Sequence, residues 1–503
     1  MSILNENWEK LGDYIVHSSP NFELMKNKQN EIGPGFCLAK WNQVTIHLET
    51  GLTHSCHHPT AHKIPLIELQ SNPSALHNTN FKKQQRKEML RGKRPEECNY
   101  CWRVEDQNQY SDRQMKSIEP WALKDFDALS LMTGDENVSP KYLEVSFSNT
   151  CNQKCIYCGP EYSTSWIEEL KHHGPVVVLK EYNKFKRTEQ GWQNLDDLYY
   201  KKNQTNPYID AFWKWFPEIY DKLEIYRITG GEPLLSKDTF KSMAFFLKNP
   251  NPNLALAINS NLSVPEKVWS KFINLCKDLI TSNVIGKLTL FTSIESWGEQ
   301  ANYARYGLDF DVYKQRIEEI ANINNLRCVF MSTYNILSVP SFYKILEWQL
   351  ELKKEYNIIS NWKEKNPSHS WIMGIDIPYL RHPQYFDVGI LTDDIKEKYM
   401  LPCLDFMKNN TSSNHAGFEE YEVIKFQRII ESIDIPKNNK IKLNINRAKF
   451  YDVINEMDKR RGTNFLKTFP ELKEFYFECK KNRNKIKDAV DIIVDKEGYG
   501  YSS

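Results

Sequence analysis

Three cysteines within eight residues are the clearest candidates for chemistry in this sequence. Cys151, Cys155 and Cys158 are separated by three and then by two residues. Thiolates at this spacing on one loop can converge on a soft metal centre. Four thiolates would close a structural zinc or iron–sulfur site, whereas three leave one metal corner without a protein ligand. An open corner is what a catalytic site requires; a zinc site whose fourth ligand lies elsewhere in the chain is the alternative.

A second cysteine set lies nearer the start of the chain. Cys37 is followed by 13 residues, Gly51, four residues and Cys56, and a Cys-x2-Cys pair follows at Cys98 and Cys101. Four thiolates can bind zinc tetrahedrally. The stretch between the first two cysteines has the pattern of two short strands joined by a turn, which predicts a hairpin with a cysteine near each end.

Four histidines surround the second of these cysteines, namely His54, His57, His58 and His62. Imidazole is a common zinc ligand, so a mixed cysteine and histidine site is one interpretation. The four cysteines already complete a ligand set, which favours ordinary exposed loop histidines.

Six short apolar segments, rich in β-branched and aromatic residues, predict the strands that position the first cysteine loop. The segments are residues 142–147, 223–228, 254–258, 288–294, 327–333 and 371–377. Their connections, of about 30 to 75 residues, are long enough for a crossover helix each time, which predicts a parallel sheet. Six β-α units predict an α/β fold, an open or partial barrel with its active site at the carboxyl ends of the strands.

Small and polar residues follow these predicted strands. The first strand runs into the cysteine loop, and the second into Thr229-Gly230-Gly231-Glu232-Pro233. Glycines at a strand end allow close backbone approach to a ligand, and the glutamate offers an acceptor to an ammonium group. The later strands lead to Asn259, Ser260 and Asn261, to Ser293 and Glu295 with Arg305 beyond them, to Thr333 and Asn335, and to Pro378.

The Cx3Cx2C loop, with the aromatic Tyr157 before its last cysteine, and the order of the strand-end residues resemble the radical S-adenosylmethionine (SAM) superfamily over about 240 residues. The resemblance implies that Cys151, Cys155 and Cys158 hold a [4Fe–4S] cluster whose fourth iron binds the amino and carboxylate groups of SAM. It also implies that an electron from the cluster cleaves SAM to a 5′-deoxyadenosyl radical, which takes hydrogen from a substrate.

In that family the strand-end residues contact SAM. The segment from Thr229 to Pro233 resembles the motif that binds the SAM amino group, and Asn259-Ser260-Asn261 replaces a threonine–asparagine–glycine turn. Arg305 stands where relatives place an arginine that pairs with the SAM carboxylate. The resemblance implies a SAM-binding set of Tyr157, Thr229, Gly230, Gly231, Glu232, Pro233, Asn259, Ser260, Asn261, Ser293, Glu295, Arg305, Thr333, Asn335 and Pro378. It identifies no catalytic residue.

The N-terminal cysteines resemble the SPASM or twitch extension of radical SAM enzymes, whose hallmark is a cysteine hairpin with Gly-x4-Cys. That extension binds auxiliary [4Fe–4S] clusters, and four cysteines correspond to one cluster in the shorter twitch type. In the relatives the extension follows the barrel, whereas here it precedes the barrel. The resemblance implies an auxiliary cluster held by Cys37, Cys56, Cys98 and Cys101, with zinc as the alternative metal.

The composition limits the possible partners. The 503 residues carry 66 lysines and arginines against 65 aspartates and glutamates, a net charge of +1, so the whole protein is not an electrostatic surface for nucleic acid. Two basic runs, at residues 82–94 and 480–487, could touch phosphates, although solvated helix faces are the default interpretation.

The sequence also predicts the compartment. No apolar run approaches the roughly 18–20 residues that span a bilayer, and the first ten residues lack the apolar core of a secretory signal. An odd count of 11 cysteines argues against a disulfide framework. We therefore expect a cytoplasmic protein that does not insert in a membrane. Cys276, Cys328, Cys403 and Cys479 are expected in the core, with Cys403 weighed as a hydrogen donor to a substrate radical.

Three regions follow from these patterns. Residues 1–125 are expected to form the twitch-like domain, residues 138–385 the radical SAM core, and residues 386–503 a mainly helical region. The leading hypothesis is a radical SAM enzyme that modifies a peptide or protein side chain and receives electrons from a donor such as flavodoxin or ferredoxin. The alternatives are modification of a nucleoside or tRNA, and a non-catalytic protein with two structural zinc sites.

Overall fold

The fold is described from a computed structural model of the 503-residue chain. The structure describes residues 10–11, 14–15, 17–174, 176–178, 182–183, 204–357, 372–380, 382–412, 414–433 and 439–494. Within these ranges no helix is both long and apolar enough to cross a membrane.

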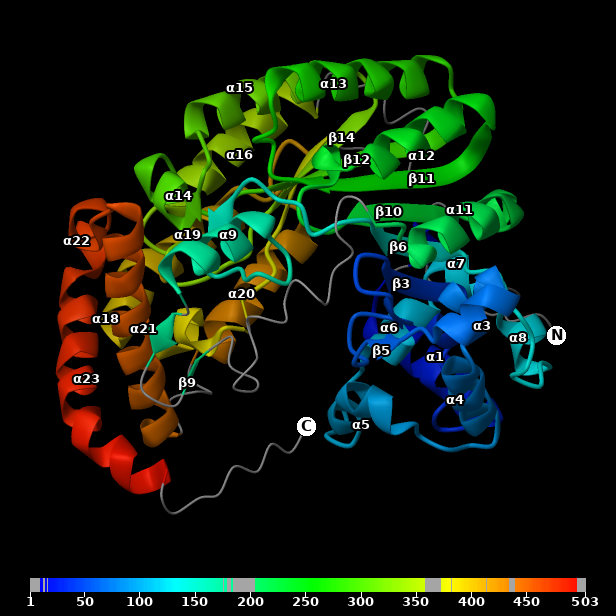
Figure 1. Ribbon diagram of the computed structural model, residues 1–503, viewed down its shortest axis with the longest axis horizontal. Helices are drawn as coiled ribbons and strands as arrows, with labels where there is room; N and C mark the ends of the chain where they lie inside the picture. The colour runs from blue at the N-terminus through cyan, green and yellow to red at the C-terminus, as the bar shows by residue number, and fades with distance from the viewer. Residues whose placement is uncertain are drawn as a thin grey trace.

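A sheet of nine described strands runs through the molecule in the order β15-β14-β12-β11-β10-β6-β3-β4-β5 (Figure 1). The strands from β15 to β6 are parallel to their neighbours, which confirms the six predicted strands and their parallel arrangement. Because parallel strands end at one edge, the cysteine loop and the strand-end residues meet there. The bounds are β6 Tyr142–Ser146, β10 Ile225–Thr229, β11 Asn251–Ser260, β12 Ile285–Ser293, β14 Leu326–Met331 and β15 Met373–Asp376.

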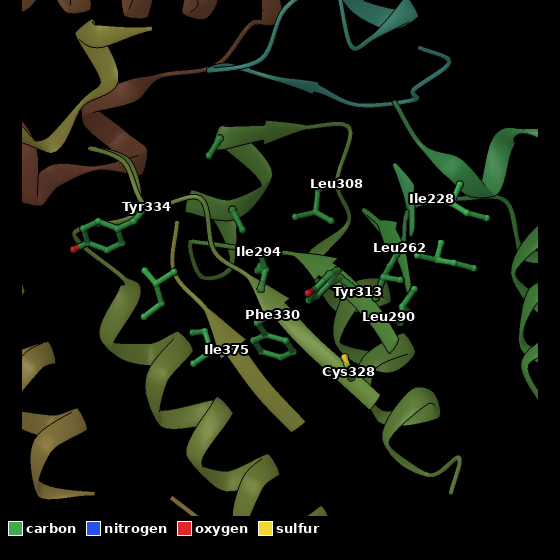
Figure 2. Close-up of a cluster of buried hydrophobic side chains, with 14 of the residues drawn as sticks. Ile228, Leu262, Leu290, Ile294, Leu308, Tyr313, Cys328, Phe330, Tyr334 and Ile375 are labelled. Atoms are coloured by element: carbon green, nitrogen blue, oxygen red, sulfur yellow. The ribbon is translucent and has the colours of Figure 1, made fainter. Parts of the chain in front are cut away.

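One face of these six strands forms the main apolar core. Ile228, Leu290, Phe330 and Ile375, from four different strands, are fully buried in it (Figure 2). Successive side chains of a strand point to opposite faces, so every second residue contributes to this core. The crossover helices between the strands supply apolar partners: α12 Lys237–Lys248, α13 Glu266–Thr281, α15 Phe310–Ala321 and α16 Phe342–Tyr356.

The opposite face of the same strands is polar and partly exposed. Glu144, Arg227, Asn259, Phe291 and Asp376 alternate with the buried residues and keep intermediate exposure. Parallel strands that are covered on both faces carry apolar residues almost throughout. The polar alternation therefore distinguishes this face from the apolar face that the crossover helices cover.

The N-terminal region joins this sheet instead of forming a separate one. β3 (Gln43–His47) pairs in parallel with β6, and β4 (Leu52–His54) and β5 (His62–Lys63) continue it in antiparallel pairs. The predicted hairpin is confirmed, and Gly51 at its turn has a φ of +68°, which favours glycine. The prediction that strand structure begins near the first cysteine is wrong, because the short helix α2 (Ala39–Asn42) precedes β3.

The N-terminal helices build a second apolar core beside the sheet. It includes Phe36, Trp41, Trp102 and Trp121 and is separate from the main core. The region therefore has its own core but shares its sheet with the rest of the chain. Its principal helices are α1 Ser19–Ile32, α4 Asn80–Leu90, α5 Asn99–Glu105 and α6 Asp112–Ser117.

The C-terminal region is mainly helical, as predicted. A left-handed Gly462, with φ of 65°, ends α21 (Lys440–Arg461), which confirms the predicted break. The predicted second helix is divided in two, because Pro470 follows the short α22 (Phe465–Thr468) before α23 (Lys473–Val494) begins. Two further helices, α19 (Leu401–Asn409) and α20 (Glu420–Ser432), connect this region to β15.

Candidate metal and cofactor site

The three cysteines of the first loop lie directly beyond the carboxyl end of β6. The two-residue strand β7 (Lys154–Cys155) holds the loop by pairing with β13 (Arg305–Tyr306), so that Cys155 is the register partner of Arg305. All three thiols are partly exposed. Burial, together with nearby Glu232 and Cys158, raises the pKa of Cys151 to about 11. An electrophilic partner such as iron is needed to hold these sulfurs as thiolates near neutral pH.

Two polar side chains donate to these sulfurs. The Asn261 Nδ2 atom lies 3.7 Å from Cys151 Sγ, and the Arg305 Nη1 atom lies 3.8 Å from Cys155 Sγ. Both contacts favour the anionic form of the sulfur. Two of the residues predicted from strand ends therefore reach the cysteine loop itself.

Glu232 is the buried carboxylate of the site. Its oxygens accept from the Asn261 amide at 2.7 Å, the Leu234 amide at 3.0 Å and the Ser260 hydroxyl at 2.9 Å. The side chain is 2% exposed, and burial raises its pKa to about 7 despite these donors. A buried carboxylate of this kind is stabilised by a cation, so it suits an ammonium group.

The two glycines before this carboxylate are required by the protein itself. Gly230 has a φ of +121°, and a Cβ there would lie 2.7 Å from both Ser146 Oγ and the Ser148 carbonyl. A Cβ on Gly231 would lie 2.5 Å from the Thr150 carbonyl. From the sequence, we expected these glycines to let the backbone come close to a ligand. In the structure, the group that comes close to them is the chain that leads into the cysteine loop.

Tyr157, Glu295 and Arg305 form one hydrogen-bonded network beside Cys155, in which Tyr157 is partly buried. The Tyr157 hydroxyl donates to Glu295 Oε1 at 2.8 Å, and Arg305 contacts Glu295 Oε2 through Nε at 2.9 Å and through Nη2 at 2.5 Å. Glu295 is fully buried and Arg305 is 5% exposed. The two charges therefore neutralise each other, and the Arg305 guanidinium is not a free partner for a separate carboxylate.

The other predicted cofactor residues fall into two groups. Thr229 donates to Glu144 at 3.4 Å and Asn259 accepts from Arg227 at 3.1 Å, so both lie on the polar face of the sheet. The remainder stabilise turns. The Thr333 carbonyl accepts from Asn335 Nδ2, and the Asn335 side chain accepts from the Leu337 amide. The Pro233 carbonyl accepts from the Thr239 hydroxyl, and the Pro378 carbonyl accepts from the Tyr334 amide. Ser293 is half-buried at the end of β12.

The four N-terminal cysteines line one cavity, together with Lys40, Ser55, Asp112 and Arg113. Burial raises the pKa of Cys37 to about 11 and that of Cys56 to about 12. The hydroxyl of Ser55 is buried in the wall without a hydrogen-bond partner in the described part of the chain. Two buried cations, Lys40 and Arg113, partly counter the rise in the Cys37 pKa, and each is also paired with a carboxylate, Lys40 with Glu97 and Arg113 with Glu105.

Neither cysteine set converges on a single point. In the described ranges, no three or more Cys, His, Asp or Glu side chains are arranged to hold one metal ion. A [4Fe–4S] cluster binds each cysteine through a different iron atom, so its ligands surround a larger core than the ligands of one zinc ion do. The four N-terminal cysteines, which line a shared cavity, match that donor arrangement, and the sulfur ligands of both sets match the softness of iron–sulfur chemistry.

The four histidines near Cys56 are not all exposed loop residues. His58 contacts Asp112 at 2.8 Å and stacks on Tyr100, and His62 contacts Thr79 at 2.9 Å. His54 lies 3.3 Å from the His47 ring, and burial lowers its pKa to about 3. The general expectation of solvated histidines is therefore wrong for these three. His57 alone stays exposed.

The first basic run does not form a single charged surface. Lys82 is buried and donates to Thr53 and the His54 carbonyl, and Arg86 is buried and donates to Asn78 at 2.8 Å. These two cations support the N-terminal core, so they cannot contact phosphates. For the second run the described residues belong to α23, and the side chain of Lys487 lies outside the described part.

The four isolated cysteines are buried, as predicted. Cys276, Cys328, Cys403 and Cys479 each have no exposed surface. Cys403 packs near Tyr334 in the main core. Its thiol is therefore part of the core and not exposed on the polar face of the sheet.

The sequence interpretation missed two residues of that polar face. Glu144 and Arg227 interrupt the apolar pattern of β6 and β10, and their exposure is intermediate. A charged residue inside an otherwise apolar parallel strand is a signal that could have identified them. Lys40 was also missed, because nothing in the sequence separates a buried lysine from an exposed one.

No protein-family model matches the chain, and no curated protein matches it either. The candidate site therefore rests on the chemistry and arrangement of its own residues.

Proposed function

We propose that the protein is a radical SAM enzyme. The observation that carries the proposal is the position of Glu232, a buried carboxylate next to Cys151 at the carboxyl edge of six parallel strands. A soft-metal loop and an acceptor for an ammonium group stand side by side there. The proposal includes a partial (β/α)6 barrel whose open side is the polar face of the sheet.

Cys151, Cys155 and Cys158 would hold a [4Fe–4S] cluster, and Glu232 would accept the amino group of SAM. Such a group would supply the one-electron chemistry by which enzymes of this class cleave SAM and take hydrogen from a substrate. Because burial raises the pKa of Glu232, an arriving ammonium group restores its charged form.

The surrounding residues keep this chemistry in place. Asn261 and Arg305 donate to two of the sulfurs and so stabilise their negative charge. The Tyr157–Glu295–Arg305 network fixes the Arg305 donor beside Cys155. The protein thereby orients a donor toward the sulfur ligands.

The N-terminal cavity is proposed to hold an auxiliary [4Fe–4S] cluster. Cys37, Cys56, Cys98 and Cys101 line it, and β3 places the cysteine hairpin next to β6. The charges of Glu144 and Arg227 act on the pKa of His57, one residue after Cys56, which places this loop near the polar face. This twitch-like extension would therefore face the polar side of the sheet although it precedes the core in sequence.

The substrate is proposed to be a peptide or protein side chain, in a cytoplasmic enzyme reduced by flavodoxin or ferredoxin. This part rests on the resemblance of the cysteine pattern alone. Modification of RNA is less favoured, because Lys82 and Arg86 of the first basic run are buried.

The test is anaerobic purification with counts of iron and sulfide, followed by incubation with SAM and dithionite. We expect about eight irons per chain, four for each of two clusters, and release of 5′-deoxyadenosine. A Cys151→Ala variant should lose about half of the iron and all SAM cleavage. The matched control is Cys276→Ala, which removes a buried cysteine outside both sets. Zinc without iron, even after anaerobic reconstitution, would reject the proposal.

A further inference from the structure

The polar face of the sheet holds two opposite charges at directly opposed positions. Glu144 on β6 and Arg227 on β10 are partners in the strand register. Each lies two residues before the end of its strand, about 7 Å below the cysteine loop and the Thr229–Pro233 segment. Neither forms a salt bridge in the described part of the chain.

The guanidinium of Arg227 is held in place without a salt bridge in the described part of the chain. Burial disfavours its charge, but nearby Tyr142 and Glu144 outweigh that effect and raise its pKa. Its Nε atom donates to Asn259 at 3.1 Å, and its carbon lies 4.5 Å from the centre of the Phe291 ring. Its other polar neighbour is the hydroxyl of Tyr142. A guanidinium has five N–H donors in a planar fork, so these neighbours leave donors for an oxyanion.

Around Glu144, several hydrogen-bond acceptors have no donor among the described residues. Glu144 Oε1 accepts weakly from Thr229 at 3.4 Å, whereas its Oε2 atom is buried and has no partner among the described residues. The hydroxyl oxygens of Thr45 and Ser146 are also buried without partners. Thr45 is the register partner of Glu144, and Ser146 follows two residues later on the same face. Buried polar atoms are ordinarily satisfied, so three adjacent orphans indicate a missing polar group.

A further charge lies near this pair. Asp376, on β15, adds to the effects that raise the pKa of Arg227. The pair therefore presents one cation and one anion, both partly exposed, on the polar face of the sheet. A ligand with both signs of polarity would satisfy both ends at once.

We propose that Arg227 and Glu144 anchor the substrate: Arg227 binds a carboxylate, while Glu144, with Thr45 and Ser146, accepts from an amide or ammonium donor beside it. The substrate class is one that carries a carboxylate and an N–H donor a few bonds apart, as amino acids and peptides do. This inference rests on the proposed function, because it assigns the face below the cofactor residues to substrate.

Binding of small probes to the full-length, anaerobically purified protein tests the anchor. The probes are N-acetylglycylglycine, with a terminal carboxylate, N-acetylglutamic acid α-amide, with a side-chain carboxylate, and neutral N-acetylglycinamide. Ligand-observed NMR should show at least one carboxylate probe binding about tenfold or more tighter than the neutral amide. Which carboxylate binds distinguishes a chain terminus from an acidic side chain.

The variants separate the two charges. Arg227→Gln should abolish the preference for carboxylate, and Arg227→Lys should retain part of it, because lysine keeps the charge but loses the planar fork. Glu144→Gln should abolish any preference for glycylglycine, which has a free ammonium group, over N-acetylglycylglycine. The control Arg428→Gln removes an exposed arginine on α20 and should leave every affinity unchanged.

Two outcomes overturn the anchor: equal affinity of the wild-type protein for the carboxylate and neutral probes, or unchanged carboxylate affinity in Arg227→Gln. These results are separable from failure of the proposed function. If the wild-type protein cleaves SAM but shows no carboxylate preference, the anchor alone is wrong. If it prefers carboxylates but neither holds iron nor cleaves SAM, the anchor binds a ligand in a protein of another function.

Discussion

Three charged side chains near the cysteine loop are almost completely removed from water. Glu295 and Arg305 balance each other, whereas Glu232 has hydrogen-bond donors but no cation within ion-pair distance among the described residues. This difference sets their separate roles. Glu295 and Arg305 already neutralise each other and have a structural role, whereas the charged form of Glu232 becomes stable only when a cation binds beside it.

Glu232 should make the stability of the cofactor-free protein depend on pH. Its pKa is about 7 in the folded state against 4.5 as the ordinary value, so the folded protein keeps a proton that the unfolded chain releases. Its contribution to the free energy of unfolding is therefore full below pH 4.5 and falls as pH rises to about 7, by up to about 3 kcal/mol. Urea unfolding at pH 5 and pH 8 should show this loss in the wild type and not in Glu232→Gln. Parallel pH profiles for the two proteins would contradict the assignment.

The Glu295–Arg305 pair should behave as a buried unit. Arg305→Gln leaves Glu295 buried without its cation and should lower the free energy of unfolding by about 3–5 kcal/mol. The double variant Arg305→Gln/Glu295→Gln removes both charges and should recover most of that loss. A double-mutant cycle by urea denaturation measures the coupling. Additive effects of the two substitutions would show that the pair is not coupled.

At the scale of elements, the cysteine loop is held from two sides. β13 pairs with β7, and helix α9 (Thr164–His173) carries Glu169, which contacts Lys154 of the loop at 2.9 Å. The same carboxylate contacts Arg461 at the end of α21 at 3.2 Å. The C-terminal helices therefore support the cysteine loop through one buried carboxylate.

Loss of Arg461 should loosen the cysteine loop. Arg461→Met leaves Glu169 with a single cation and removes the stacking of the guanidinium near Trp166. We expect about 2 kcal/mol less stability and faster amide hydrogen exchange in residues 151–158. Lys459→Met, at an exposed position on the same helix, is the matched control. Equal exchange rates in both variants would exclude the supporting role.

At the scale of the whole molecule, the N-terminal region completes the sheet. β3 covers the edge of β6, which is the first strand of the parallel set. A bare strand edge presents unpaired amides and carbonyls and invites aggregation. The two regions are thus linked by strand pairing, although each has its own apolar core.

A fragment that begins at residue 138 should not behave as an independent domain. It would expose the edge of β6 and part of the apolar surface that Leu48 and Ile46 cover in the intact chain. We expect it to aggregate or to lack a cooperative thermal transition, as measured by size-exclusion chromatography and circular dichroism. A monodisperse fragment with a sharp transition would contradict this view of the sheet.

The local patterns of the sequence determined the six parallel strands, the hairpin at Gly51 and the helix end at Gly462. Each depends on short-range physics: the alternation of apolar residues, the length of a connection, or the freedom of glycine at positive φ. The two cysteine sets were identified in the same way, by the spacing of cysteines along the sequence. Their metals remain predictions, because ligand spacing alone does not distinguish zinc from an iron–sulfur cluster.

Only the tertiary structure determined which residues lie next to one another. It joined β3 to β6, buried Lys82 and Arg86 of a run that reads as a charged surface, and paired Arg305 with Glu295. It also placed Glu144 and Arg227 at paired positions on neighbouring strands. These contacts link residues far apart in the chain, and their energies depend on burial and geometry that no local pattern carries. The sequence therefore determines which residues can do chemistry, and the folded chain determines which of them remain available for it.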